Sequence, residues 1–109
     1  MEKLCKVADV PLGTMKGFKA KGRQILLANV DGSFYAMDAV CSHVQGFLPR
    51  GQLLKNIVIC PIHHAQYDVT TGRVVKDVDA VIKMMTGKGA SNLKTYKILE
   101  QEGYVFVDI

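Results

Sequence analysis

The sequence predicts an all-β fold, an antiparallel sandwich or partly open barrel with one short helix. Short runs in which apolar and polar residues alternate recur along the chain, as expected for half-buried strands. Turn signals such as Asp31-Gly32 separate these runs. With 109 residues and a hydrophobic fraction of 49%, the chain is long enough to bury one core. We therefore expect residues 1–109 to form a single domain.

The first 40 residues predict three or four antiparallel strands. Pro11 and Gly13 interrupt the first alternating run, Lys21-Gly22 reverses the second, and Asp31-Gly32 is typical of a two-residue hairpin turn. The expected strands are residues 4–8, 15–20, 24–30 and 33–37.

The second half of the chain repeats this rhythm with one exception. After a turn at Pro49-Arg50-Gly51, an apolar run leads directly into Cys60. Residues 77–86 break the alternation, because Val78, Val81, Ile82 and Met85 are spaced as on one face of a helix. The expected strands are residues 57–59, 66–69, 73–75, 93–99 and 104–109.

Two pairs of metal-binding side chains stand out from this frame. Cys41 and His43 have one residue between them, and Cys60 and His63 have two. Each spacing lets a single loop aim a thiolate and an imidazole at the same point, and two hairpins packed side by side would bring the loops together. The residues therefore predict a four-ligand metal site.

Two metals suit this ligand set. Cys₂His₂ is a common structural zinc set, although its usual grouping puts Cys with Cys and His with His. Two ferric ions, two sulfides and two thiolates instead sum to zero charge when both imidazoles are neutral. Such a centre accepts an electron more readily than one with four thiolates.

Charge and cysteine content limit the function classes. The net charge is +4, and six basic residues lie in the first quarter of the chain, so docking to an acidic redox partner is one hypothesis. Nucleic-acid binding is disfavoured, because no aromatic platform accompanies these lysines. No apolar run of 18 residues predicts a membrane span, and the N-terminus does not resemble a signal peptide. Beyond the two ligand cysteines only Cys5 remains, which predicts a reducing, cytoplasmic setting.

The chain resembles the Rieske ferredoxins over most of its length. Residues 7–13 (VADVPLG) are similar to the family pattern VAxxxDLPxG, and residues 60–72 match CPxHxxx[FY]DxxTG. The resemblance implies one 2Fe-2S cluster, held in loops 41–48 and 60–67. It further implies that Cys41 and Cys60 bind the inner iron and that His43 and His63 bind the outer iron, near solvent.

Several residues near the ligands depart from family patterns. The respiratory branch has an extra Cys in each ligand loop, in addition to the ligand Cys, and these two extra Cys are joined as a disulfide; it also has a Ser just after the second loop. Gly46, Ile62 and Ala65 stand at these positions, so we expect no such disulfide and a lower potential. Pro61 follows the second Cys, as in the family. Tyr67 replaces a usual Phe and is either a core aromatic or a hydroxyl donor that raises the potential.

His64 and residues 77–91 are further departures. His64 stands where the family usually has Gly, which puts the local backbone in doubt. We expect a solvent-side residue, with a proton relay, a partner contact or competition with His63 as alternatives. Residues 77–91 are longer than the usual family loop, and resemble archaeal Rieske-type ferredoxins.

These observations predict a one-electron carrier that passes electrons from a reductase to an oxygenase or another acceptor. We expect a monomer that binds redox partner proteins but neither nucleic acid nor membrane. An enzyme is not predicted, because no nucleophile with a base, no paired carboxylates and no open metal position are evident. A small subunit of a nitrite-reductase-like oxidoreductase and a structural zinc domain are the alternatives.

Overall fold

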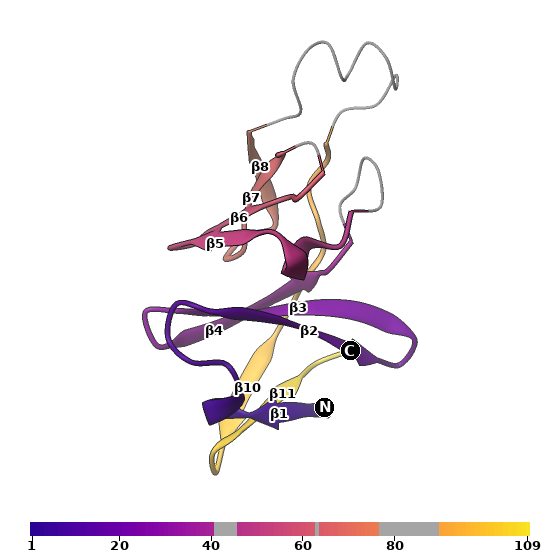
Figure 1. The fold of residues 1–109 in the computed structure, drawn as a ribbon. Helices are drawn as coiled ribbons and strands as arrows, with labels where there is room; N and C mark the ends of the chain where they lie inside the picture. The colour runs from indigo at the N-terminus through magenta and orange to yellow at the C-terminus, as the bar shows by residue number, and fades with distance from the viewer. Residues whose placement is uncertain (41–45, 63, 77–89) are drawn as a thin grey trace.

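The fold is a stack of three antiparallel sheets, with the chain termini at one end (Figure 1). The computed structural model describes residues 1–40, 46–62, 64–76 and 90–109. Among the described residues the only helices are two 3₁₀ turns, so the all-β prediction is confirmed. The predicted ligands Cys41, His43 and His63 lie outside the described residues, as does the predicted helix at 77–86.

The central sheet has the strand order β2-β3-β4-β9. Two tight turns join its first three strands. Lys21 and Gly22 have φ of 48° and 76°, and Asp31 and Gly32 have φ of 54° and 90°. Positive φ at both central residues matches the twist of a two-residue hairpin, so both predicted reversals are confirmed. The strands are β2 (Met15–Ala20), β3 (Arg23–Val30), β4 (Ser33–Asp38) and β9 (Thr95–Tyr96).

Strand β3 supplies two hydrophobic cores, because its side chains alternate between the two faces of the central sheet. Leu26 and Ala28 are fully buried in one core, which also contains Cys60 and Tyr67. Ile25 and Leu27 are fully buried in the other, together with the C-terminal strand. One strand therefore ties the two outer sheets together.

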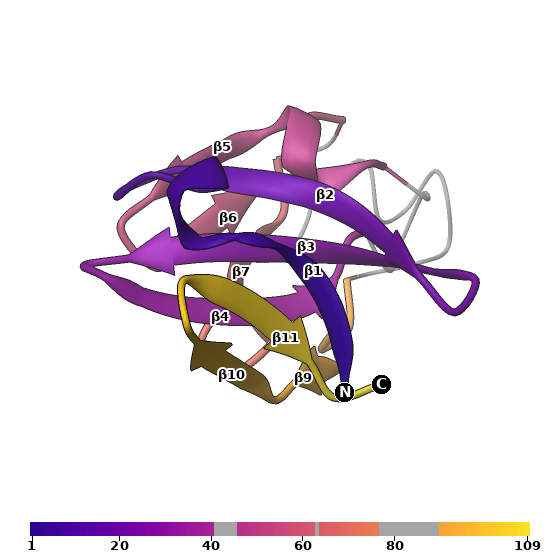
Figure 2. The same ribbon diagram turned by 90° about the horizontal axis from the view of Figure 1, so that it is seen from below.

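The base sheet, in the order β1-β11-β10, lies beneath the central sheet and brings the two ends of the chain side by side (Figure 2). Its strands are β1 (Glu2–Lys6), β10 (Ile98–Gln101) and β11 (Tyr104–Val107). The prediction of a strand at 4–8 was partly wrong, since Val7–Asp9 forms a 3₁₀ turn. The Asp9 carboxylate accepts a hydrogen bond from the Lys6 backbone N–H at 3.0 Å, which favours a turn over continued pairing.

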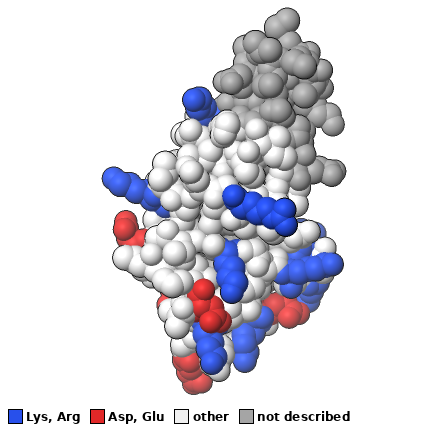
Figure 3. Space-filling view, in the orientation of Figure 1, with Lys and Arg blue, Asp and Glu red and all other residues white. Residues whose placement is uncertain are grey.

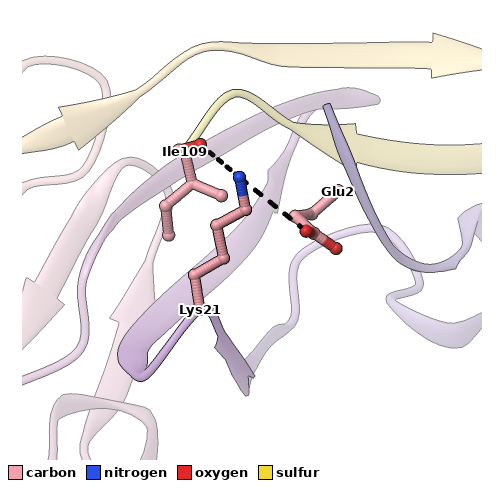
Figure 4. A network of polar contacts seen from close by, with 3 residues as sticks. All are labelled: Glu2, Lys21 and Ile109. Carbon is pink, nitrogen blue, oxygen red and sulfur yellow. Dashed lines mark hydrogen bonds and ion pairs between the residues drawn. The ribbon is translucent and has the colours of Figure 1, made fainter.

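Side chains also connect the base and central sheets. Lys21 Nζ donates to the Ile109 carbonyl at 3.4 Å and lies 4.0 Å from a Glu2 carboxylate oxygen (Figure 4).

Within the central sheet, side chains hold the short strand β9 in place. The Tyr96 hydroxyl donates to Asp38 at 2.5 Å and accepts from Arg23 at 3.3 Å. Burial and the bond to Asp38 raise the pKa of Tyr96. This pair of bonds holds β9 against the ends of β3 and β4.

The distal sheet is a continuous meander in the order β5-β6-β7-β8. A 3₁₀ turn, η2 (Leu48–Arg50), precedes it and includes the Pro49 of the predicted turn. Strand β5 was not predicted, because the Lys55-Asn56 turn after it has no Gly, although Lys55 adopts a φ of 57°. The strands are β5 (Gln52–Leu54), β6 (Ile57–Ile59), β7 (Gln66–Asp68) and β8 (Arg73–Lys76).

None of the helices within the described ranges has the length and apolar character needed to span a membrane.

Candidate metal centre

The second predicted ligand loop is the tip of the β6–β7 hairpin. Ile59 pairs with Gln66, and beyond this pair the Cys60 N–H donates to the Ala65 carbonyl at 2.8 Å. The His64 N–H then donates to the Cys60 carbonyl at 3.2 Å. Backbone bonds thus close the connection at its base, and Cys60 stands at the start of it. A hairpin with Cys60 at its tip was predicted, and this part of the prediction is confirmed.

The first predicted ligand loop is closed in a different way. Val40 and Phe47, which flank residues 41–46, form an isolated antiparallel bridge. Just beyond them the Leu48 N–H donates to the Ala39 carbonyl at 2.8 Å, and the Leu48 side chain is fully buried. The stem is therefore a single bridge that leads into a 3₁₀ turn. The two ends of the predicted hairpin are thus paired in antiparallel fashion, and residues 41–45 between them lie outside the described residues.

The two loops meet at Cys60 and Gly46. Cys60 is fully buried, and a Cβ added at Gly46 would lie 2.9 Å from its Sγ. That separation is shorter than a non-bonded carbon–sulfur contact allows, so position 46 has room only for Gly. The Cys60 thiol therefore faces the end of the first loop, where the sequence predicts the second half of the ligand set. Cys60 is the one predicted ligand within the described ranges.

Position 46 also approaches the side chain of Ile62. The same added Cβ would lie 3.1 Å from Ile62 Cδ1, and the Ile62 side chain is 50% exposed. Gly46 and Ile62 are the two positions at which the sequence predicted that no loop-to-loop disulfide would form. An apolar contact thus joins the loops there.

His64 adopts a left-handed backbone conformation with φ of 59°. This region favours Gly and is uncommon for other residues, among which His, Asn and Asp occur more often. The doubt about the backbone here is resolved, because His64 keeps the conformation that Gly would adopt. Its side chain is exposed, as the sequence predicted for a solvent-side residue, and Pro61 is exposed beside it. Whether His64 competes with His63 for iron stays a prediction.

Tyr67 is fully buried in the core that contains Cys60. Ala65, at the position where the respiratory branch has Ser, is also fully buried and belongs to the same core. The prediction that Tyr67 is a core aromatic is confirmed. The second prediction, that its hydroxyl raises the potential, requires a redox measurement.

A small hollow of about 290 Å³ opens beside the second loop. Residues of η2 and β5 form one wall, and the loop forms the other. The sequence indicated no role for Arg50 and Gly51 beyond a turn, yet both line this hollow together with Cys60 and His64. Gly51 is the sequence feature that points to this arrangement. A Cβ at position 51 would lie 1.9 Å from the Ile59 carbonyl oxygen. The two segments can approach this closely only with Gly at position 51.

Comparison with known proteins decides the family. The family model of the Rieske [2Fe-2S] domain matches residues 1–97. The chain belongs to the Rieske [2Fe-2S] family. Sulredoxin from Sulfurisphaera tokodaii is 36% identical over 91 residues, 84% of this chain and 82% of sulredoxin. The ferredoxin component of biphenyl 2,3-dioxygenase from Rhodococcus jostii is 34% identical over 86 residues, 79% of each chain.

A solved structure agrees with these sequence relatives. The Rieske-type fold seen here superimposes on the Sphingomonas yanoikuyae B1 ferredoxin with a TM-score of 0.81 and 27% sequence identity. The match covers 98% of this chain and 96% of that one. The resemblance seen in the sequence is therefore confirmed, and the cofactor is one [2Fe-2S] cluster. Structural zinc, the alternative that the four side chains alone left open, is replaced by this cofactor.

The described residues fit a cluster of this kind. A thiolate ligand for iron has to be screened from water, and the Cys60 side chain is fully buried. Gly46 lets the backbone of the first loop approach the Cys60 sulfur closely, because a Cβ at this position would lie only 2.9 Å from that sulfur. Pro61, Ile62 and His64 follow Cys60 in the same loop and are exposed. The buried thiol is therefore followed directly along the chain by residues that contact solvent.

Proposed function

We propose that this protein is a one-electron carrier that takes electrons from a reductase and delivers them to an oxygenase. Membership of the Rieske family carries the proposal, since the bound [2Fe-2S] cluster supplies reversible uptake and release of one electron. The ferredoxin component of biphenyl 2,3-dioxygenase, one of the similar proteins, is named as part of an oxygenase system. By itself the chain is not an enzyme.

The proposed ligands are Cys41 and Cys60 on one iron and His43 and His63 on the other, in loops 41–48 and 60–67 of a single domain. The described residues of these loops would then have different roles. Cys60 is buried and supplies a thiolate, while Gly46 allows the end of the first loop to approach that sulfur closely. The exposed tip of the second loop, including Pro61, supports electron exit on this side.

The first experiment measures whether the purified protein carries one reversible electron. Absorption and low-temperature EPR spectra are recorded before and after dithionite reduction, with iron and zinc counted in the same sample. We expect two irons per chain, a rhombic Rieske-type signal on reduction, and a redox titration that fits one electron. A protein with one zinc and no colour would end the proposal.

Ligand assignment needs a matched pair of variants. Replacing Cys41, His43, Cys60 or His63 by Ser or Ala is expected to abolish most of the iron content. His64→Gly is the control, because Gly suits the φ of 59° at this position and leaves His63 in place. Full iron content in His63→Ala, with loss in His64→Gly, would reverse the assignment.

We also propose an oligomeric state and a cellular compartment for this carrier. A monomer in the cytoplasm is consistent with a sequence that contains only three cysteines. Gel filtration and cell fractionation test these two points. Isolation in a tight complex with a larger catalytic chain would instead indicate a subunit of an oxidoreductase.

A further inference from the structure

Most of the net positive charge of the described residues lies at the end of the molecule that contains Cys60. Residues 46–76, which form η2 and the distal sheet, contain four basic side chains and a single acidic one. Residues 1–40 and 90–109, the base and central sheets, contain eight basic and seven acidic side chains and are nearly balanced. On the face shown in Figure 3, acidic atoms gather towards the base end. The four distal basic residues are Arg50, Lys55, Arg73 and Lys76.

The one distal acid, Asp68, offsets only part of this charge. The Asp68 carboxylate accepts hydrogen bonds from the Thr70 backbone N–H at 2.9 Å and from the Thr70 hydroxyl at 2.6 Å. All four basic side chains are exposed. Within the described ranges, none of the four forms an ion pair with a carboxylate. The distal end thus presents a net positive surface to approaching molecules.

Arg50 is the best supported of these cations. It ends η2, where the Arg50 N–H donates to the Phe47 carbonyl at 3.1 Å and its guanidinium carbon lies 5.8 Å from the centre of the Phe47 ring. The buried Leu48 and the close approach of Gly51 to β6 fix the backbone on either side. A cation on such a rigid support loses little conformational entropy when it binds a ligand.

Two hollows meet at Arg50. The larger, of about 570 Å³, is bordered by Gln24, Val40, Phe47 and Arg50. The smaller, of about 290 Å³, is bordered by Arg50, Gln52, Cys60 and His64 among others. Arg50 therefore stands between an open groove and the side of the second ligand loop. The two glutamine side chains can add neutral hydrogen bonds on either side of the guanidinium.

We propose that Arg50 and the two hollows beside it dock an acidic segment of the protein that exchanges electrons with this chain. The proposal rests on the proposed carrier function and names the docking surface and the charge of the partner. A carboxylate of the partner bound by the planar Arg50 guanidinium orients that partner against the second ligand loop. The surrounding positive field raises the encounter rate with acidic proteins.

The test uses Arg50→Gln and a control that removes the same charge from the base end. Lys97→Gln is suitable, because Lys97 is exposed and precedes β10, outside residues 46–76. A fluorescently labelled hexaglutamate peptide is the binding probe, measured by anisotropy at low ionic strength. We expect Arg50→Gln to weaken its binding roughly fivefold and Lys97→Gln to change it less than twofold.

A kinetic measurement gives a second readout. The reduced protein gives one electron to ferricyanide, an anion that becomes ferrocyanide, or to the cation tris(phenanthroline)cobalt(III), which becomes cobalt(II). We expect Arg50→Gln to slow the anionic oxidant roughly fivefold at low salt and to speed the cationic one, with both effects lost at high salt. Hexaglutamate should slow ferricyanide oxidation of the wild type.

Three outcomes would overturn the docking surface. The first is that Arg50→Gln and Lys97→Gln have equal effects on both readouts. The second is that the midpoint potential of Arg50→Gln shifts enough to explain the change in rates. The third is that the protein binds a single-stranded oligonucleotide more tightly than hexaglutamate. The carrier function is tested separately by the one-electron titration of each variant. A normal titration with unchanged hexaglutamate binding would remove the docking proposal and leave the carrier function intact.

Discussion

The base end and the distal end of this protein are built from the same element, the antiparallel hairpin, but they differ in what the sequence has to specify. The base and central sheets contain the longest strands, have turns with positive φ at both central residues, and carry almost balanced charge. The distal sheet has strands of three or four residues. Just before it, Gly46 and Gly51 stand where a Cβ would clash with neighbouring atoms, and residues 46–76 carry an excess of positive charge. The frame follows from patterning, whereas the site depends on close contacts.

The largest expected effect comes from strand β3, which serves both ends. Leu26→Ala and Ile25→Ala each remove a fully buried side chain, on opposite faces of the central sheet, so each should lower the free energy of unfolding by about 2–5 kcal/mol. Only Leu26 lies in the core that contains Cys60. We expect Leu26→Ala to lower iron content as well, measured alongside urea unfolding. Equal iron loss in both variants would mean that the two cores are not separate.

A smaller effect is expected from the close approach of η2 to β6. Gly51→Ala forces a Cβ to within 1.9 Å of the Ile59 carbonyl oxygen, so the backbone must shift, at a cost of about 1–3 kcal/mol. Gly17→Ala is the control in the central sheet. Its Cβ would lie 2.8 Å from Phe47 Cζ and 3.1 Å from Pro49 Cγ, which are side-chain and not backbone atoms, so we expect a smaller cost. Denaturant unfolding compares the two, and a greater loss in Gly17→Ala would contradict the distinction.

The pH dependence of stability should also differ between the ends. Burial raises the pKa of Asp68, but hydrogen bonds from Thr70 and Asn56 outweigh it, so this pKa lies below its usual range. A carboxylate with a lowered pKa adds stability above its unfolded-state pKa, and that stability is lost as pH falls through the folded-state pKa. Asp68→Asn should therefore cost about 1–2 kcal/mol at pH 7 and much less in acid.

Unfolding of wild type and variant at several pH values between neutral and strongly acidic measures this convergence. The matched control is Asp108→Asn, an exposed carboxylate near the C-terminus of the base sheet. We expect its curve to run parallel to that of the wild type. A constant gap between Asp68→Asn and wild type at every pH would disprove the assigned role of the charge.

The smallest expected effect concerns the midpoint potential. If the hydroxyl of Tyr67 stabilises the reduced state as one hydrogen bond of about 0.5–1.5 kcal/mol, Tyr67→Phe should lower the midpoint by roughly 20–60 mV. Tyr35→Phe is the control, because Tyr35 packs against the same core from β4. Spectroelectrochemical titration measures both. An unchanged midpoint in Tyr67→Phe would leave this residue a packing role only.

Much of the frame could be predicted from the sequence, since local patterns determine it. Residues 15–20 alternate up to Lys21-Gly22, and the structure has strand β2 over the same six residues. The first strand was placed too late, because the side chain of Asp9 competes with strand pairing. Strand β5 was missed, since a turn without Gly follows it. These errors arise where one side chain or one backbone angle outweighs periodicity.

The site could be predicted in its chemistry but not in its surroundings. The spacing of Cys60 and the residues after it predicted a second ligand loop, and the structure places this segment at the tip of the β6–β7 hairpin. The contact between Gly46 and the Cys60 sulfur joins residues that are distant in sequence, and no local pattern encodes it. Charge shows the same limit. The six basic residues of the first quarter suggested a docking face, but in three dimensions they belong to a nearly neutral end, whereas the net positive charge lies in residues 46–76.

The pairing of β1 with β11 has a consequence for the order in which this protein folds. Glu2 pairs with Val107, so the base sheet forms only when segments from the two ends of the chain meet, which is slow. Strands β5 to β8 are neighbours along the chain, and such local contacts form quickly. During refolding, amides of the meander should therefore gain protection from hydrogen exchange before those of β1 and β11. The loop that contains Cys60 would then fold before the base sheet has formed.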